Sequence, residues 1–411
     1  MTAQAQVAAP RRSPLRGLAE SMRRFFKILI RNKAGFLGFC GLVFYLLLIT
    51  VGPRLVPFDA EVKLDQIAAP PGSRDQLLTR RADAETYTSL ESLAGRTVGV
   101  VRDTGGATLV APYAGTFTVR EFRWRGGRGV PDALEALAAG EIDALVIFSE
   151  SVRRYITAPS AQQAAQAETF ADLVVSNPAL GPVHLFGTDT QGRDIFSHIV
   201  NGGSVLIFTA LLAGFLSTLI AVTLGSLAAL LGGIVDRGLT ALANFVLVIP
   251  RFPLLVVLAS LIQLNNVVLL ATLIAALSWP SLMRALRAQV LSLRERDYVE
   301  AAVALDLGTR HIILREILPN MISFVAINFI FAITHAMYEQ VGLVLLGMAP
   351  INDYTWGVML YFGRTRGTLF SPDGASMVLA PVLAIALFQV SMVMFARAME
   401  EIFDPRLRTS V

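Results

Sequence analysis

Residues 298–320 read YVEAAVALDLGTRHIILREILPN and lie between two long apolar runs of the chain. Ala301, Ala302 and Ala304 favour a short helix with a thin side that a groove on another protein can approach closely. Pro319 is expected to stop this helix before the next apolar run, because proline has no backbone N–H to continue the hydrogen-bond ladder. The pattern predicts a docking helix between two hydrophobic segments.

The composition indicates a membrane protein. Of the 411 residues, 54% are hydrophobic and only 16% are charged, whereas soluble domains carry about 25% charged residues. A net charge of +4 is too small to predict a nucleic-acid partner. The single cysteine, Cys40, excludes an intrachain disulfide. The histidines lack the spacing of metal ligands, so no metal site is expected: they are His184, His198, His311 and His335.

Six apolar stretches are long enough to cross a bilayer, for which a helix needs roughly 20 residues. They are Ala34–Val51, Ser204–Val235, Leu239–Leu264, Val267–Met283, Met321–Met348 and Ser376–Phe395. The sequence therefore predicts an all-α polytopic membrane protein with six transmembrane helices. Pro250 and Pro253 are expected to break the third helix and free carbonyl groups there.

Basic residues ahead of the first span place the N-terminus in the cytoplasm, by the positive-inside rule. They are Arg11, Arg12, Arg16, Arg23, Arg24, Lys27, Arg31 and Lys33, against Glu20 alone. Six crossings return the C-terminus to the cytoplasm. The loop between spans four and five then also lies inside, with Arg284, Arg287, Arg294, Arg296, Arg310 and Arg315, and the loop around Asn352–Tyr361 lies outside. No cleavage site follows the first span, which is expected to remain as an anchor.

A stretch of soluble composition separates the first two spans. Within it, Thr97–Val101, Phe117–Phe122 and Ala144–Phe148 are typical of strands, and Asp132–Ala139 is typical of a helix. This alternation predicts a small inserted α/β lobe outside the cytoplasm. Gly105 and Gly106 either open a helix whose N-terminal amides receive an anion or form a plain turn.

The stretch at 298–320 resembles the EAA loop of ABC-importer permeases, in which a short helix inserts into a cleft on an ATPase subunit. Glu300, Ala301 and Ala302 match the name of the motif, and Ile317-Leu318-Pro319-Asn320 matches its end. Asp306 replaces the family's usual glycine, and Gly308 follows two residues later, so a turn of different shape is expected. The alternative is an amphipathic loop helix that lies on the membrane surface.

Residues 186–194, FGTDTQGRD, resemble a signature of the C-type subunit of the dipeptide/oligopeptide subfamily. The matching residues are Gly187, Thr188, Asp189, Gly192, Arg193 and Asp194. Gln340–Gly347 and Asp404-Pro405-Arg406-Leu407-Arg408 resemble two further motifs of that subfamily, although Glu339 lies one place earlier than its usual glutamate. Asp189 is expected to accept hydrogen bonds from amides of its own loop, and Arg193 to pair with Asp194. The alternative role of this turn is a purely structural cap.

The resemblance implies a type I ABC importer permease. Its segments are a cytoplasmic stretch 1–33, a first helix 34–52, an inserted lobe 53–183, a permease core 184–399 with the coupling loop 298–320, and a cytoplasmic tail 400–411. Leu93–Val100 and Ala136–Ala144 resemble parts of one lobe of amino-acid-type solute-binding proteins. Because the insertion has room for one lobe, a docking or gating role is expected rather than autonomous ligand capture.

The chain is not expected to be an enzyme. Its three lysines, Lys27, Lys33 and Lys63, do not follow a glycine-rich loop of the ATP-binding type. The resemblance implies that ATP and Mg²⁺ bind two separate ATPase subunits. It also implies a second permease of the B type, an external solute-binding protein and the cytoplasmic (inner) membrane of a prokaryote.

Charged groups within the spans are candidates for the translocation pathway. Arg251 lies fourteen residues beyond Arg237, about 20 Å along a helix, and is expected near mid-membrane, where it meets a peptide carboxylate. The alternatives are an ion pair with Glu339 or with the partner permease, or a shifted span boundary. His335 lies one turn from Glu339, and these two are expected to form a hydrogen bond. The cargo is expected to be peptides, with oligosaccharides or metal complexes as alternatives, and a solute-sensing receptor is the alternative of another class.

Overall fold

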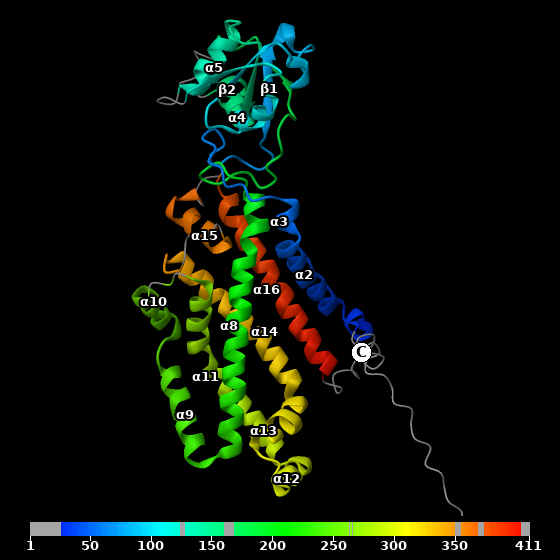
Figure 1. Ribbon diagram of the computed structural model, residues 1–411, viewed down its shortest axis with the longest axis vertical. Coiled ribbons are helices and arrows are strands. Elements are labelled where there is room, and N and C mark those ends of the chain that lie inside the picture. Colours follow the sequence, from blue (N-terminus) through cyan, green and yellow to red (C-terminus); the bar gives the residue numbers. More distant parts are fainter. Residues whose placement is uncertain are drawn as a thin grey trace, which may run out of the picture.

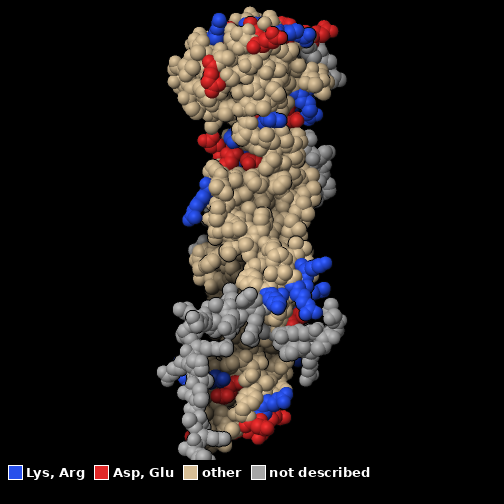
Figure 2. All heavy atoms as spheres, turned by 90° about the vertical axis from the view of Figure 1, so that its right-hand side faces the viewer, with Lys and Arg blue, Asp and Glu red and all other residues tan. Residues whose placement is uncertain are grey.

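The computed structural model describes residues 26–123, 128–159, 168–262, 264, 266–349, 355–368 and 374–403. The α/β lobe sits on one end of an elongated helical bundle, and helix α12 (Asp297–Ala304) lies at the other end (Figure 1). On the face shown in Figure 2, charged side chains gather on the lobe, at its junction with the bundle and towards the far end. The middle of the bundle is largely uncharged on this face, as expected for a surface in contact with lipid.

Among the described residues, five helical segments are long and apolar enough to cross a membrane. They are α2 (Lys33–Thr50), α8 (Ile195–Leu231), α11 (Val267–Arg294), the run Thr309–Leu345 that ends in α14 (Ile322–Leu345), and α16 (Ser376–Phe403). Helices α9 (Gly233–Val248) and α10 (Arg251–Ile262) pass the same test only as a pair, and a bend of 85° separates them. Counted as one crossing, this pair gives the sixth predicted span.

The predicted break of the third span is confirmed. Ile249 is extended, with φ −79° and ψ 129°, because the ring of Pro250 disfavours a helical conformation for the residue before it. The chain therefore turns sharply, and α10 lies beside the middle of the bundle rather than at its end (Figure 1).

Pro280, in contrast, does not end its helix. Its missing N–H would leave the carbonyl of Ala276 without a donor, but the indole nitrogen of Trp279 donates to that oxygen at 3.0 Å. Helix α11 consequently continues to Arg294. Our prediction of a loop after Met283 was wrong here, because Arg284, Arg287 and Arg294 lie on the helix.

Helix α8 is the central element of the bundle and packs along α11 and α14. It begins nine residues before the predicted Ser204, and it ends at Leu231 rather than Val235, because Gly232 and Gly233 adopt positive φ. Gly203 allows the buried ring of Trp356 to approach α8, since an added Cβ would lie 2.6 Å from that ring.

Helix α2 packs against α16 through three glycines spaced three residues apart. A Cβ at Gly38 would lie 2.7 Å from the backbone nitrogen of Phe395 and 2.7 Å from the carbonyl oxygen of Ser391. A Cβ added at Gly35 would lie 2.1 Å from Ala398 Cβ, and one added at Gly41 would lie 2.1 Å from Ser391 Oγ. Small residues thus let the two backbones meet, which is a common way for membrane helices to associate. Helix α16 continues to Phe403, past the predicted start of the tail at residue 400.

The predicted α/β lobe is confirmed, with a five-stranded sheet in the order β3-β2-β4-β1-β5. The strands are β1 (Asp75–Arg80), β2 (Thr97–Val101), β3 (Thr118–Phe122), β4 (Ala144–Phe148) and β5 (Leu173–Asn177). Strand β2 is parallel to both β3 and β4, whereas β1 is antiparallel to β4 and β5. Sequence analysis missed β1 and β5.

Short helices connect these strands and the spans. In the lobe, α4 (Gly105–Val110) begins at the predicted glycine pair with Thr104 as its N-cap, and α5 (Gly129–Ala138) contains most of the predicted helix. The remaining short helices are α3 (Gly52–Leu55), α6 (Ser149–Val152), α13 (Thr309–His311) and α15 (Trp356–Thr365). Arg11, Arg12, Arg16, Arg23 and Arg24, Asn352 and the motif Asp404-Pro405-Arg406-Leu407-Arg408 lie outside the described residues.

The glycine contact between α2 and α16 predicts a large effect of a small substitution. Gly38→Ala should destabilise the protein by about 1–3 kcal/mol, because the new methyl group overlaps backbone atoms that cannot rotate away. Gly238→Ala on α9 is the matched control, since no atom lies within 4 Å of its added Cβ. Thermal unfolding in detergent should separate the two variants, and equal stability of both would contradict this packing.

Candidate translocation site and coupling helix

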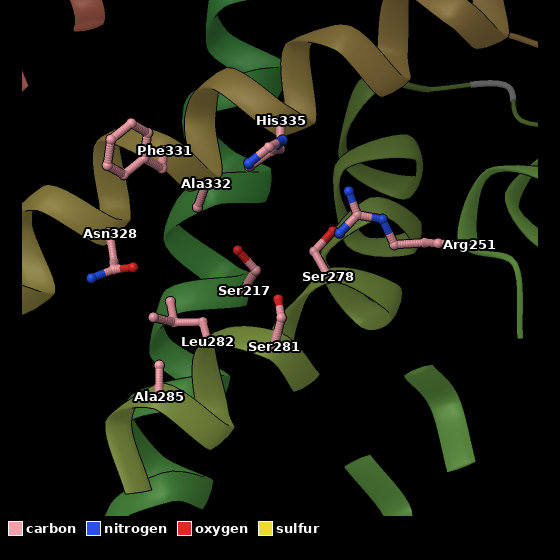
Figure 3. A pocket seen from close by; sticks show the side chains of 10 residues that line it. All are labelled: Ser217, Arg251, Ser278, Ser281, Leu282, Ala285, Asn328, Phe331, Ala332 and His335. Carbon is pink, nitrogen blue, oxygen red and sulfur yellow. The ribbon is translucent and has the colours of Figure 1, made fainter. Parts of the chain in front are cut away.

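Four helices enclose a polar cavity of about 200 Å³ in the bundle. Its lining comes from α8, α10, α11 and α14: Ser217, Arg251, Ser278, Ser281, Leu282, Ala285, Asn328, Phe331, Ala332 and His335. In Figure 3, Arg251 approaches from the side of α10, and Asn328, Phe331 and His335 come from α14. Two of the three predicted pathway residues, Arg251 and His335, therefore line one cavity.

The break of the third span places Arg251 at the first position of α10. Its guanidinium group forms an ion pair with Glu339 of α14, whose side chain is only 8% exposed against 36% for Arg251. Phe252 packs on Gly342, where an added Cβ would lie 2.8 Å from its ring, and this contact holds α10 against α14. Of the alternatives raised for Arg251, the internal ion pair with Glu339 is the one observed.

The predicted hydrogen bond between His335 and Glu339 is not found in the described part of the chain. One carboxylate oxygen of Glu339 contacts Arg251, and the other, Oε2, accepts no hydrogen bond there. His335 instead lines the cavity beside Arg251. The buried carboxylate of Glu339 thus holds the guanidinium group of Arg251 at the rim of the cavity.

Sequence analysis missed the small polar residues of this cavity. Ser278 donates to the carbonyl of Ile274 at 2.6 Å, Ser217 to Gly214 at 3.1 Å, and the Asn328 amide to Phe324 at 2.8 Å. These bonds satisfy the donors within their own helices, so such residues are inconspicuous in an apolar run. The one available signal was the spacing of Ser278 and Ser281, which puts two hydroxyl groups on one face of α11.

The EAA helix forms as predicted, but one alanine faces the opposite way. Glu300 and Ala301 of α12 are exposed, as a docking surface requires. Ala302 is only 4% exposed and packs with Val299 into a hydrophobic cluster of this chain. The prediction that Ala302 belongs to the thin docking side was therefore wrong, and its small size serves internal packing.

Asp306 ends helix α12, with Gly308 shaping the turn that follows. The N–H of Leu307 donates to Ala302 O at 3.2 Å and the N–H of Asp306 to Val303 O at 3.0 Å, the pattern of a Schellman motif. Asp306 takes the left-handed position with φ +50°, which explains why glycine suits this place. Pro319 does not stop α12 as predicted: it is the second residue of the 3-10 turn Leu318–Met321 that leads into α14, and a first turn tolerates proline.

The signature turn, Gly187–Asp194, is held by its own carboxylates as predicted. Asp189 Oδ1 accepts from the amides of Gln191 at 2.7 Å and Arg193 at 2.9 Å. Asp194 caps α8 by accepting from Phe196 N at 3.2 Å and Ser197 N at 3.3 Å. Its Oδ1 also lies 3.5 Å from His184 Nδ1, while the pairing of Asp194 with Arg193 stays a prediction.

The signature turn also joins the bundle to the segment that leads into the lobe. Thr188 is fully buried and accepts from Ala69 N at 2.8 Å through its hydroxyl oxygen. Gly187 and Gly192 adopt positive φ, and an added Cβ would lie 2.2 Å from Ala69 O or 2.0 Å from Lys63 O. These contacts favour the structural-cap role for the turn.

Comparison with known proteins agrees with this architecture. Residues 221–409 match the family of binding-protein-dependent transport system inner membrane components. A Brucella suis biovar 1 protein named as a peptide permease is 31% identical over 236 residues, which cover 57% of this chain and 77% of that protein. The oligopeptide transport system permease protein OppC of Haemophilus influenzae is 29% identical over 48% of this chain and 64% of its own length.

Two of the solved structures that match are substrate-binding proteins. The amino acid ABC transporter substrate-binding protein AbpA of Streptococcus pneumoniae, bound to L-arginine, is 16% identical over 27% of this chain and 40% of that chain, with a TM-score of 0.21. An arginine transport system periplasmic binding protein of Legionella pneumophila is 15% identical over 30% of this chain and 53% of that chain, with a TM-score of 0.22. Scores this low carry no argument about the lobe.

The sequence match, in contrast, extends over most of the length of the Brucella relative, and the family match at residues 221–409 includes the EAA loop and the broken span. Together with several helices able to cross a membrane, it shows that this chain belongs to the family of inner membrane components of binding-protein-dependent transport systems.

Proposed function

We propose that this chain is a permease subunit of an ATP-driven peptide importer that works by alternating access. The observation that carries the proposal is the polar cavity at the broken span, with Arg251 at its rim and hydroxyl and amide groups on its walls. A guanidinium group suits a carboxylate, and serine and asparagine suit peptide groups. The names of the Brucella and Haemophilus relatives support peptides as the cargo.

The break between α9 and α10 places the guanidinium group of Arg251 at the cavity. Unwound backbone is tolerated at membrane depth only where it is buried in protein or lines a water-filled space. The ends of α9 and α10 at Val248 and Arg251 meet this condition if substrate and water reach the cavity during transport. In this mechanism Glu339 holds Arg251 in the resting state, and a substrate carboxylate competes for the same guanidinium group.

Transport requires partners. Family membership supports two ATPase subunits, which bind ATP and Mg²⁺, a second permease of the B type and an external solute-binding protein. In this arrangement α12 docks on an ATPase subunit through the side that bears Glu300 and Ala301. The signature turn and the lobe then lie outside the cytoplasm, at the opposite end of the bundle (Figure 1), and both termini lie in the cytoplasm.

Uptake by proteoliposomes tests the cargo directly. The chain is reconstituted with its co-encoded permease, ATPase and binding protein, and ATP-dependent uptake of a labelled oligopeptide mixture, an oligosaccharide and a nickel complex is compared. Peptide uptake is the expected result, because the cavity combines a cation with peptide-compatible groups. Uptake of only the oligosaccharide or the nickel complex would refute peptide cargo while leaving the transporter class intact.

Docking of α12 on an ATPase predicts that bulk on its exposed side uncouples the complex. Ala301→Phe should lower binding-protein-stimulated ATP hydrolysis by at least tenfold, because the larger side chain prevents close approach to a groove on the ATPase. Ala288→Phe is the matched control, since Ala288 is also an exposed alanine but lies on α11, outside the coupling loop. Normal stimulation in the Ala301 variant would show that this side of α12 does not transmit the signal.

A further inference from the structure

The segment Asp59–Ala69, named here the latch segment, lies between the lobe and the signature turn. On the bundle side it is fixed by backbone bonds: Lys63 N donates to Gln191 O at 3.0 Å, and Ala68 N donates to Asp189 O at 2.8 Å. Asp59 Oδ2 accepts from Asp194 N at 3.0 Å. The latch segment therefore contacts the residue that caps α8.

On the lobe side the latch segment fills the crevice at the carboxyl ends of β2 and β4. Leu64 N donates to Asp103 O at 3.2 Å, directly after β2. Asp65 Oδ1 accepts from Gly105 N at 3.3 Å, and Gln66 Nε2 donates to Asp75 Oδ2 at 3.2 Å. The amide of Gln66 packs so closely on Gly105 that an added Cβ would lie 2.0 Å from Nε2.

Two carboxylates therefore meet in this crevice, one from each side of the junction. Asp75, at the start of β1, is only 4% exposed, and Asp65 is partly buried. Two buried oxygens, Asp75 Oδ1 and Gln66 Oε1, have no hydrogen-bond partner within the described residues. Two like charges at such a place repel each other and lose hydration, so the contact is most favourable when the carboxyl groups are protonated.

The charged groups around the pair are too few to neutralise both carboxylates. Lys63 and His184 face the pair, but Lys63 Nζ lies 3.0 Å from Asp59, and His184 Nδ1 lies 3.5 Å from Asp194. The adjoining groove carries charges of both signs, from Glu61, Arg102, Asp103 and Glu121.

We propose that the latch segment is a proton-sensitive latch, which fixes the lobe to the signature turn and the N-terminus of α8 while Asp65 and Asp75 hold a proton, and loosens when both are ionised. The inference concerns the junction alone and does not depend on the cargo. Because the latch segment contacts both the lobe and the cap of α8, its release frees the lobe from the transporting helices.

The direction of the pH dependence follows from the two carboxyl groups. Burial, with the Asp75 charge, raises the pKa of Asp65 to about 7, and burial raises the pKa of Asp75 to about 6. The ordinary value for aspartate is about 3.9. A raised pKa means that the docked state binds protons more tightly than the released state, so docking is strongest below about pH 4 and weakens as pH rises through about 7.

Hydrogen exchange on the full chain in lipid nanodiscs tests the latch. After correction for the intrinsic exchange rate, protection of amides 63–69 and of Gly105 should fall at least tenfold between pH 5 and pH 8, the effect of a single pKa unit. Amides of α5 serve as the internal control and should not change. Asp65→Asn and Asp75→Asn should each weaken the pH dependence and the double variant should abolish it, because burial raises the pKa of each carboxyl group by itself, whereas Asp132→Asn, at an exposed site on α5, should retain it.

Three outcomes would overturn the proposal. The first is protection that does not change with pH in the unmodified chain. The second is a pH dependence that persists unchanged in the Asp65→Asn, Asp75→Asn double variant. The third is recovery of protection at pH 8 in millimolar calcium, which would assign the pair to a cation rather than a proton. A loss of protection that includes α5 would instead report unfolding of the whole lobe, and would also count against a local latch.

Discussion

A bilayer offers no hydrogen-bond partner to the peptide backbone, and this constraint organises the helical part of the molecule. Where the sequence interrupts a helix, the freed groups must be satisfied inside the protein. At Pro280 the indole of Trp279 takes the carbonyl of Ala276, and α11 continues. At Pro250 the helix is interrupted instead, and the chain bends by 85°.

The bend has consequences for charge as well as for shape. It brings Arg251 to the wall of a polar cavity and beside Glu339, whose carboxylate is almost fully buried. An ion pair in a low-dielectric site recovers only part of the cost of desolvating two charges, so it is weak support for stability alone. Its position on a cavity gives a reason for its presence in the mechanism we propose, in which a substrate carboxylate exchanges with Glu339. In that mechanism, stability and transport make opposite demands on the same guanidinium group.

The two ends of the bundle are built on residues with left-handed backbone. At the lobe end, Gly187 and Gly192 let the latch segment lie directly on the signature turn. At the other end, Asp306 and Gly308 form the turn that ends α12, whose buried residues Val299 and Ala302 pack on the bundle. In the proposed mechanism each end contacts a partner, and α8 and α14 connect the two ends through the cavity walls.

The existence of the spans and of the lobe could be predicted, because long apolar runs and alternating strand and helix patterns are local signals. Strands β1 and β5 could not, since β1 forms by pairing with β4, about seventy residues away, and four of the six residues in its sequence DQLLTR are polar. Whether the side chain of Ala302 faces inward or outward depends on how α12 packs, and the composition of the helix does not determine this. The cavity serines were hidden because they bond to their own helices. The sequence showed Asp306 where the family usually has glycine, and the structure shows that Asp306 takes a left-handed conformation with φ +50°.

The central claim is that the cavity beside the broken span is this subunit's part of the translocation pathway. Cysteine accessibility tests it most directly: Ser281→Cys is made in a Cys40→Ser background, reconstituted with the partner subunits and exposed to a membrane-impermeant thiol reagent. Our account predicts labelling that depends on the nucleotide state and is reduced by peptide. The Leu219→Cys control should stay unlabelled, because its site on α8 is 51% exposed but does not line the cavity. Failure of the cysteine at 281 to react in any nucleotide state would contradict the account.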